Sequence, residues 1–141
     1  LMAPKKDKTR KKERYFNYLF LVCDGMTLLR RREEKDIWNS LYEFPMMETG
    51  SSVSLRELLT KKPFCSLNNS SVSSNGHEPF IYNHQLTHQV LHCSFYMLKV
   101  SRLPDWTDNQ YFSIPLEKLQ TFAIPRVIDR FLADLDRKGI R

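Results

Sequence analysis

The amino-acid sequence predicts an α+β fold in which a mixed β-sheet is sandwiched by helices, and three observations lead to that class. Short runs rich in aromatic and β-branched residues, typical of buried strands, recur along the chain between turn signals. Helical patterns are confined to residues 54–62, 115–120 and 125–139. The resulting order, β-β-β-α-loop-β-β-β-α-α, lacks the strand–helix alternation of a doubly wound parallel sheet.

The composition bounds the class of protein. The chain of 141 residues fits one domain with a proper core, and its contents of 41% apolar and 12% aromatic residues are those of a globular chain. No apolar run approaches the roughly 20 residues that span a bilayer, so no membrane partner is expected. Cys23, Cys65 and Cys93 are widely spaced and odd in number. This argues against a disulfide framework or a cysteine metal site, and it favours a reducing, intracellular compartment.

Basic residues crowd the amino terminus and account for much of the net charge of +6. Residues 1–13 are polar, contain Pro4 and show no apolar period, so we interpret them as a basic interdomain linker before a domain at 14–141. The start at Leu1-Met2 suggests a piece of a longer protein. The basic run is either a solvated tail or a nonspecific contact to DNA phosphates, made by Lys5, Lys6, Lys8, Lys11 and Lys12.

The sequence of the first third of the domain indicates three strands. Residues 15–22 and 26–30 are strand-like and flank Asp24-Gly25, a two-residue hairpin signal. Residues 37–45 form a third apolar segment, which a proline ends. Trp38, Leu41, Tyr42 and Phe44 are expected to be largely buried. Trp38 and Tyr42 could instead stack on bases, but with Leu41 and Phe44 around them a core position is favoured.

The sequence after residue 45 indicates helices that pack on further strands. Ser54 with Glu57 three residues later is a capping-box pattern that starts the first helix. The Ser/Asn-rich stretch within residues 64–78 has too little apolar content to pack, so we expect a mobile loop there. The last helix begins at Pro125, ends at Gly139 and presents one apolar face. The predicted strands are 80–83, 90–100 and 110–114, and the apolar face comprises Val127, Ile128, Phe131, Leu132 and Leu135.

Residues 83–89 form a polar turn between two of these strands, and rigid scaffolds commonly present recognition groups at such places. His84, His88 and His92 fall four residues apart there. On a strand such residues share a face but lie about 13 Å apart, so one zinc ion cannot bridge them and no metal site is predicted. Two interpretations of His88 stay open: a structural histidine bonded to backbone, or a recognition residue.

Three stretches of the chain resemble one known family. Arg30-x-Arg32 followed by Ile37-Trp38-Asn39-Ser40-Leu41-Tyr42-Glu43-Phe44-Pro45 is similar to the R-x-x-x-G-x-W-x-G-L-x-E-F-P run in the carboxy-terminal domain of MutY-family adenine DNA glycosylases. His84-x-x-Thr87-His88 resembles that family's H-x-F-[ST]-H loop, and Ala123-Ile124-Pro125-Arg126-Val127-Ile128 resembles its closing A-L-P-x-P-x run. Ser40 stands where the family has the glycine after its tryptophan, and Leu86 stands where it has an aromatic residue.

The resemblance implies a Nudix-like fold, as in MutT-type nucleotide pyrophosphatases. It implies a chain that recognises 8-oxoguanine opposite adenine in duplex DNA during base excision repair. In that family a separate amino-terminal helical domain removes the adenine and carries an iron–sulfur cluster. Neither its cysteine motif nor its helix-hairpin-helix glycines are found in this sequence. The fragment alone is therefore expected to be no enzyme and to hold no cofactor.

The resemblance also implies roles, partners and a location. The Thr87 hydroxyl would accept the N7–H hydrogen bond that distinguishes 8-oxoguanine from guanine, His88 would contact phosphate or hold the loop, and Leu86 would press on the base stack. Arg30 and Arg32 would add phosphate contacts. We expect a monomer in the bacterial cytoplasm, associated with the nucleoid, whose partners are lesion-containing DNA and the catalytic domain. The lesion-binding and DNA-binding set is then Leu86, Thr87, His88, His84, Arg30 and Arg32.

Two alternatives remain: a Nudix pyrophosphatase, or a Nudix-like protein-docking module that uses the Ser/Asn-rich loop. The Nudix pattern G-x5-E-x7-R-E-U-x-E-E fits when R-E-U is placed on Arg56-Glu57-Leu58, with Glu48 as the first acid. Tyr42 then falls on the glycine, and Thr60 and Lys61 fall on the two metal-binding acids. Because a lysine repels Mg²⁺, which needs oxygen ligands, hydrolase activity is disfavoured. Steep salt dependence would separate DNA binding from apolar docking.

Overall fold

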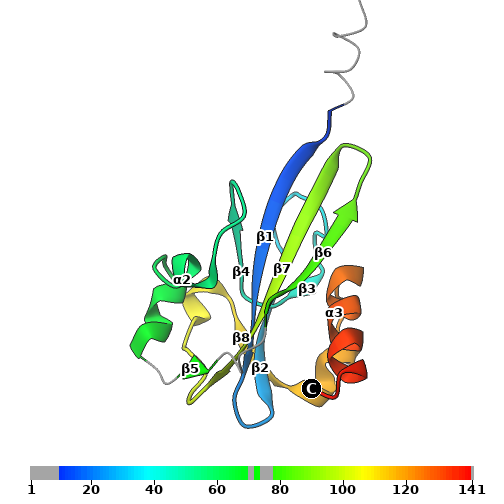
Figure 1. Ribbon diagram of the computed structural model, residues 1–141. Coiled ribbons are helices and arrows are strands. Elements are labelled where there is room, and N and C mark those ends of the chain that lie inside the picture. The colour runs from blue at the N-terminus through cyan, green and yellow to red at the C-terminus, as the bar shows by residue number, and fades with distance from the viewer. Residues whose placement is uncertain (1–9, 70–71, 74–77, 141) are drawn as a thin grey trace, which may run out of the picture.

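Two long parallel strands form the centre of the molecule. The computed structural model describes residues 10–69, 72–73 and 78–140. Strand β1 (Lys12–Val22) runs parallel to β7 (Gln89–Val100), with Lys12 opposite Gln89 and Val22 opposite Lys99. Figure 1 shows this pair with β4 (Met46–Thr49) on one side and β6 (Phe80–Gln85) on the other, both antiparallel to their neighbours. The short β5 (Val72–Ser73) pairs with the far end of β7.

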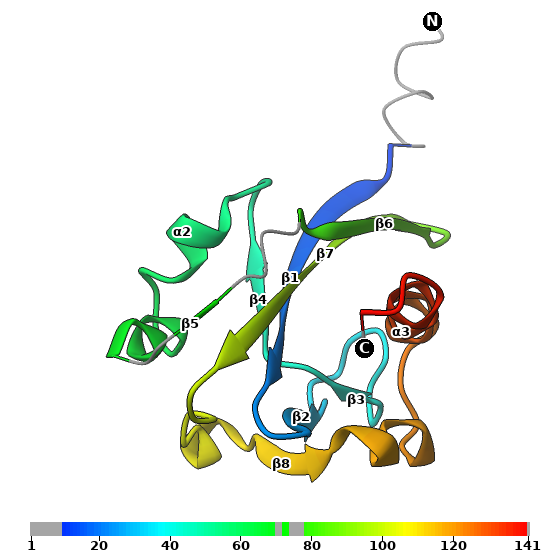
Figure 2. The ribbon, with the colours of Figure 1, turned by 60° about the horizontal axis from the view of Figure 1, so that its bottom comes forward.

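A second sheet lies across one end of the first, as Figure 2 shows. It has the order β3-β2-β8, from β3 (Tyr42–Glu43), β2 (Met26–Arg31) and β8 (Phe112–Pro115). The predicted hairpin between β1 and β2 is present. Asp24 and Gly25 both have positive φ, at 49° and 75°, which is the backbone that a tight two-residue hairpin turn requires.

Helices cover both faces of the large sheet (Figure 2). Helix α3 (Arg126–Arg137) packs on one face, and the short α2 (Leu55–Leu58) with the 3₁₀ helix η1 (Phe64–Asn69) packs on the other. Because side chains alternate along a strand, β1 supplies Phe16, Tyr18 and Phe20 to the core under α3, and Leu19 and Leu21 to the core under α2. The structure confirms the predicted mixed sheet sandwiched by helices.

Aromatic rings fill the core beneath α3. Phe95 stacks on Phe131 with ring centroids 4.4 Å apart, and Tyr18 stacks on the other side of Phe95 at 4.6 Å. All five residues of the predicted apolar face of α3 are buried. Each fully buried side chain of this size stabilises the fold by about 2–3 kcal/mol, so these rings hold α3 to the sheet.

The ends of the helices follow the sequence signals. The Ser54 side chain accepts the hydrogen bond of the Glu57 amide at 3.1 Å, so the predicted cap starts α2. Pro125 precedes α3, and Gly139 takes a φ of 70° after its end, while the Ile140 amide donates to the Leu135 carbonyl at 2.9 Å. The left-handed glycine therefore closes α3 as predicted.

Several predicted boundaries are wrong. Strand β1 begins at Lys12, two residues inside the predicted linker, and α2 is a single turn that ends at Leu58 instead of reaching residue 62. The start of the expected mobile loop is η1, because Phe64 and Leu67 anchor it in the core. The rest of that loop at 70–71 and 74–77 lies outside the described residues, as do Lys5, Lys6 and Lys8.

The carboxy-terminal connections are 3₁₀ helices. Residues of the predicted turn form η2 (Thr107–Asn109), and the predicted helical turn after Pro115 is η3 (Leu116–Thr121). Trp106, whose position the sequence left undecided, is buried. Within the described ranges, the structure contains no helix that is both long and apolar enough to cross a membrane.

Candidate functional site

The turn between β6 and β7 contains fewer residues than the predicted turn at 83–89. His84 and Gln85 belong to β6, and the Leu86 amide donates to the Gln89 carbonyl at 2.8 Å, which leaves Thr87 and His88 at the tip. The side chains of both tip residues are exposed. The tip therefore offers a hydroxyl and an imidazole to solvent from the end of a paired hairpin.

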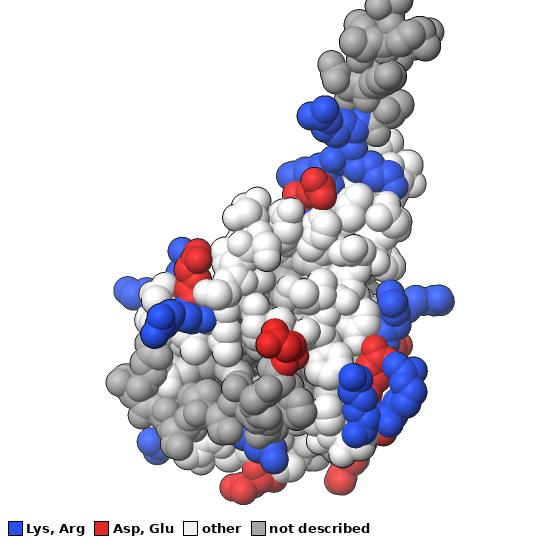
Figure 3. All heavy atoms as spheres, viewed as in Figure 1, with Lys and Arg blue, Asp and Glu red and all other residues white. Residues whose placement is uncertain are grey.

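The start of β1 holds this tip in place. The Lys12 amide donates to the carbonyl of His88 at 3.0 Å, and the Lys11 amine donates to the Gln85 side chain at 3.0 Å. Lys11 and Lys12 thus bring cations beside the turn, and Arg10 precedes them in the sequence. Figure 3 shows basic side chains gathered at this end of the molecule, with acidic atoms beside them.

The three histidines do not converge. His92 on β7 stacks on Tyr15 at 4.6 Å, and its ring nitrogens lie 2.8 Å from Glu13 and 3.0 Å from Asn83. His84 is half-buried against Trp38, which borders the core under α3, and His88 stays exposed at the tip. Among the residues that the structure describes, no three His, Cys, Asp or Glu side chains are grouped to hold a metal ion.

The turn before β3 reaches the same end of the sheet. The indole of Trp38 packs edge-on against His84, with centroids 5.6 Å apart, and against Phe16 at 5.9 Å. Trp38 and Ser40 take left-handed φ values of 59° and 70°. Trp38 is half-buried against the core cluster, which fits the core interpretation better than a base-stacking one.

The third resembling stretch also joins this region. The Tyr42 amide donates to the Ala123 carbonyl at 2.8 Å, so the segment before α3 pairs with β3. Tyr42 packs half-buried against Phe122, with ring centroids 4.9 Å apart. The three stretches singled out in the sequence are therefore neighbours in space.

The expected phosphate contact of Arg32 is wrong. Its side chain is only 2% exposed, and its guanidinium donates to the fully buried carboxylate of Glu43 at 3.1 Å and to Asp36 at 3.2 Å. Arg30 is 20% exposed and pairs with Glu43 at 3.1 Å and with Glu34 at 3.3 Å. The arginines mainly neutralise a buried acid, since an unpaired charge there would be strongly unfavourable.

A chain of ion pairs extends from this buried acid to β4. Arg14 on β1 donates to Asp36 at 2.7 Å and holds both carboxylate oxygens of Glu48, at 2.8 and 2.9 Å. The Arg14 hydrogen bond lowers the pKa of Asp36 to about 2 and lowers the pKa of Glu48, whereas burial raises the pKa of Glu43. The network fixes the loop at 33–41 on the sheet.

The sequence did not single out Arg14, Asp36 or Gln89 as site residues. Arg14 also donates to the Gln89 side chain at 3.0 Å, so the network reaches the base of the β6–β7 turn. The apolar residues of β1 predicted the position of the strand but not the partners of Arg14. Asp36 and Glu48 lie 22 and 34 positions further along the chain, and no local pattern connects them to Arg14. Leu86, expected to wedge into DNA, packs half-buried against the core cluster.

The loop–helix element after β4 is where the Nudix pattern falls. A shallow cavity of about 340 Å³ there is lined by residues that include Glu48, Glu57 and Lys61. Arg14 already binds both oxygens of Glu48, and Lys61 places an amine where the pattern requires an acid. The Thr60 hydroxyl donates to the Glu57 carbonyl at 2.6 Å. Glu48 and Glu57 thus supply carboxylates at this element, whereas Thr60 and Lys61 supply none.

A mixed sheet between helices, with a loop and short helix after β4, defines the class as a Nudix-type fold. Residues 17–134 match the NUDIX domain model, and because the match spans most of the chain, the chain belongs to that family. The MutT protein from Methanosarcina mazei Go1 is similar in structure, with 17% identity, a TM-score of 0.58 and coverage of 93% of this chain and 98% of that one.

A second similar structure is a MutT from a comparison of Aliivibrio salmonicida and Vibrio cholerae. It has 13% identity and a TM-score of 0.51, with 90% of this chain and 99% of that chain covered. At these identities the likeness shows the fold alone. No match was found among curated protein sequences.

Proposed function

We propose that this Nudix domain is the lesion-recognition domain of an adenine DNA glycosylase, and that it reads 8-oxoguanine opposite adenine in duplex DNA. The observation that carries the proposal is the exposed Thr87–His88 turn beside the cations at the start of β1. A polar, uncharged reading group next to basic side chains combines the two kinds of contact that DNA recognition needs: base contacts for specificity and phosphate contacts for position.

The reading chemistry is assigned to the tip. 8-Oxoguanine presents an N7–H donor and a C8 carbonyl that guanine lacks, so its reader needs a hydrogen-bond acceptor. The Thr87 hydroxyl accepts that hydrogen and donates its own elsewhere. His88 contacts the adjoining phosphate. A good polar contact of this kind discriminates by about 1–3 kcal/mol.

The phosphate contacts are assigned to the start of β1. Lys11 and Lys12 lie beside the tip, with Arg10 next to them in the sequence, and the attraction of these cations for phosphate is independent of base sequence. Lys5, Lys6 and Lys8 extend the same basic run in the sequence. Arg30 makes at most a minor phosphate contact, because its partly exposed guanidinium already pairs with Glu34 and Glu43.

The proximity of the three resembling stretches supports the same proposal. Trp38 contacts His84, and Tyr42 pairs with Ala123. Ser40, which stands where the MutY family has a glycine, keeps the positive φ that a glycine would accept without strain. The proposal further implies a separate helical domain that removes adenine and carries an iron–sulfur cluster.

Nucleotide pyrophosphatase activity is the second candidate, and membership of the Nudix family supports it. Against it stand the arginine-bound Glu48 and the amine of Lys61 in the corresponding cavity. The test is Mg²⁺-dependent hydrolysis of 8-oxo-dGTP, measured as pyrophosphate release. Release that Glu57→Gln abolishes would put this candidate first.

The proposal is tested by fluorescence anisotropy with labelled duplexes that differ only in 8-oxoguanine:adenine or guanine:adenine. We expect preference for the oxidised lesion, and we expect Thr87→Val to lower that preference about tenfold or more. Thr87→Ser keeps the hydroxyl and is the matched control, which should retain the preference. Binding to both duplexes should weaken steeply with salt.

Two results would contradict the proposal. One is equal affinity for the two duplexes, both for the chain alone and when it is joined to an adenine glycosylase catalytic domain. The joined form is included because linkage raises the effective concentration of weakly binding halves. The other is an undiminished preference in the variant that combines Thr87→Ala with His88→Ala.

A further inference from the structure

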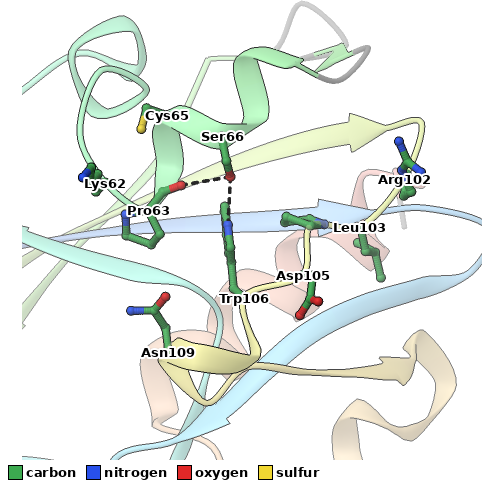
Figure 4. Close-up of a pocket in the computed structure, with 10 residues that line it drawn as sticks. Lys62, Pro63, Cys65, Ser66, Arg102, Leu103, Asp105, Trp106 and Asn109 are labelled. Atoms are coloured by element: carbon green, nitrogen blue, oxygen red, sulfur yellow. Dashed lines mark hydrogen bonds between the residues drawn. The ribbon is translucent and has the colours of Figure 1, made fainter.

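A second concave site lies beyond the other end of β7 from the Thr87–His88 turn. A pocket of about 840 Å³ opens between the segment before η1 and the connection from β7 to η2 (Figure 4). Its volume is in the range of ligand sites, about 300–1,000 Å³. Its apolar wall includes Pro63, Leu103 and Trp106. The proposed reading of DNA uses none of these residues, so this site is independent of that function.

The floor of the pocket is preformed. The indole N–H of Trp106 donates to the Ser66 hydroxyl at 2.9 Å, and that hydroxyl donates to the Pro63 carbonyl at 3.1 Å (Figure 4). Phe64 stacks on Trp106 with centroids 5.6 Å apart. Trp106 lines the site but is only 6% exposed, and Phe64 covers one face of its ring. A ligand therefore does not have to order these groups on binding.

Two exposed cations stand on opposite sides of this wall. Figure 4 shows Lys62 on one side and Arg102 on the other. Within the described ranges neither cation has a hydrogen bond or ion pair, in contrast to the five arginines that pair with acids: Arg14, Arg30, Arg31, Arg32 and Arg137. The nearby Asp105 carboxylate accepts from the Thr107 hydroxyl at 2.8 Å. Lys62 and Arg102 thus remain available for a ligand.

We propose that this pocket docks an extended peptide segment of a partner protein, with an apolar side chain against Leu103 and Trp106 and acidic residues on either side for Lys62 and Arg102. We choose a peptide as the ligand because the two cations lie on opposite sides of the pocket. One phosphate group would need donors that converge on it, whereas acidic residues spaced along a strand match cations on opposite sides. With 6% of Trp106 exposed and Phe64 stacked on one face, little of the indole is accessible for stacking a nucleobase.

The first experiment titrates the 141-residue chain into a fluorescein-labelled hexapeptide that has a leucine and a phenylalanine between pairs of glutamates. We expect saturable binding that weakens about fivefold when Lys62→Ala and Arg102→Ala are combined, since each exposed ion pair contributes modestly. Lys118→Ala removes an exposed cation on η3 and is the matched control, which should leave affinity unchanged. The same peptide with both apolar residues replaced by serine should not bind.

A second readout locates the peptide. Cys65 lines the pocket, whereas Cys23 lies elsewhere, and both thiols are half-buried. Saturating peptide should slow alkylation of Cys65 by iodoacetamide and leave Cys23 unaffected, as peptide-mapping mass spectrometry would show. Failure to bind the peptide, equal protection of both thiols, or displacement of the peptide by dGMP or inorganic phosphate would each overturn the proposal.

Discussion

The indole of Trp38 lies edge-on against the imidazole of His84, with ring centroids 5.6 Å apart. These residues are 46 positions apart in the sequence, and their contact joins the turn before β3 to the strand that leads into the Thr87–His88 tip. Each belongs to a different stretch that the sequence singled out. The contact therefore links the buried ion-pair network to the proposed reading turn.

A double-mutant cycle measures this link. Trp38→Ala and His84→Ala should show a coupling free energy of about 0.5–1.5 kcal/mol in urea unfolding, the range for an aromatic pair beyond its buried area. Phe16 also contacts Trp38, so the single Trp38 variant should lose more stability than the single His84 variant. Fully additive losses would contradict a direct interaction between the two rings.

The buried ion pair between Arg32 and Glu43 should control stability. Arg32→Ala leaves a fully buried carboxylate with only Arg30 as its partner, so the free energy of unfolding should fall by about 3 kcal/mol. Arg31→Ala is the matched control, because its pair with Glu33 is exposed, and it should cost below about 1 kcal/mol. Replacing the pair together, Arg32→Met with Glu43→Leu, should recover much of the loss. A small effect of Arg32→Ala would contradict the structural role assigned here.

Backbone strain at Ser40 gives a third prediction. With φ at 70°, a residue that carries a Cβ is strained by about 1 kcal/mol relative to glycine. Ser40→Gly should therefore raise the unfolding free energy by a few tenths of a kcal/mol, after the loss of the exposed hydrogen bonds to Arg31 and Asn39. Ser40→Val should lower it. Equal thermal midpoints for the two variants would show that this turn is not strained.

The acid stability of the fold should depend on Asp36. Its pKa is lowered from 3.8 to about 2 by the hydrogen bond from Arg14. A lowered carboxyl pKa contributes stability above the unfolded value, and that contribution is lost as the pH falls from about 4 towards 2. Asp36→Asn should lower stability at neutral pH and flatten the pH dependence of urea unfolding between pH 4 and 2. Parallel curves for the two proteins would contradict this assignment.

The sequence predicted much of the fold because its signals are local. The Asp24-Gly25 hairpin, the Ser54 cap and the apolar face of α3 each depend on neighbouring residues, and all are present. The boundaries of α2 and of the loop after it were not predicted correctly. Phe64 and Leu67 hold η1 in the core through contacts with residues distant in the chain, which no local pattern shows.

The site was predicted only in part for the same reason. The pattern placed Thr87 and His88 at an exposed turn, which the structure confirms as a location. The same pattern could not show that Arg32 contacts the buried Glu43. That contact depends on the pairing of β2 with β3. Nor could it find Arg14, whose partners come from β4, the loop before β3 and the start of β7.

Backbone amide chemical shifts of this chain, recorded by NMR while duplexes with 8-oxoguanine:adenine or guanine:adenine are added, test the central claim most directly. The account predicts that Arg10, Lys11 and Lys12 shift with both duplexes, whereas Thr87 and His88 shift further with the oxidised lesion. Identical shifts with the two duplexes, or lesion-dependent shifts confined to the cavity at Glu48, Glu57 and Lys61, would contradict it.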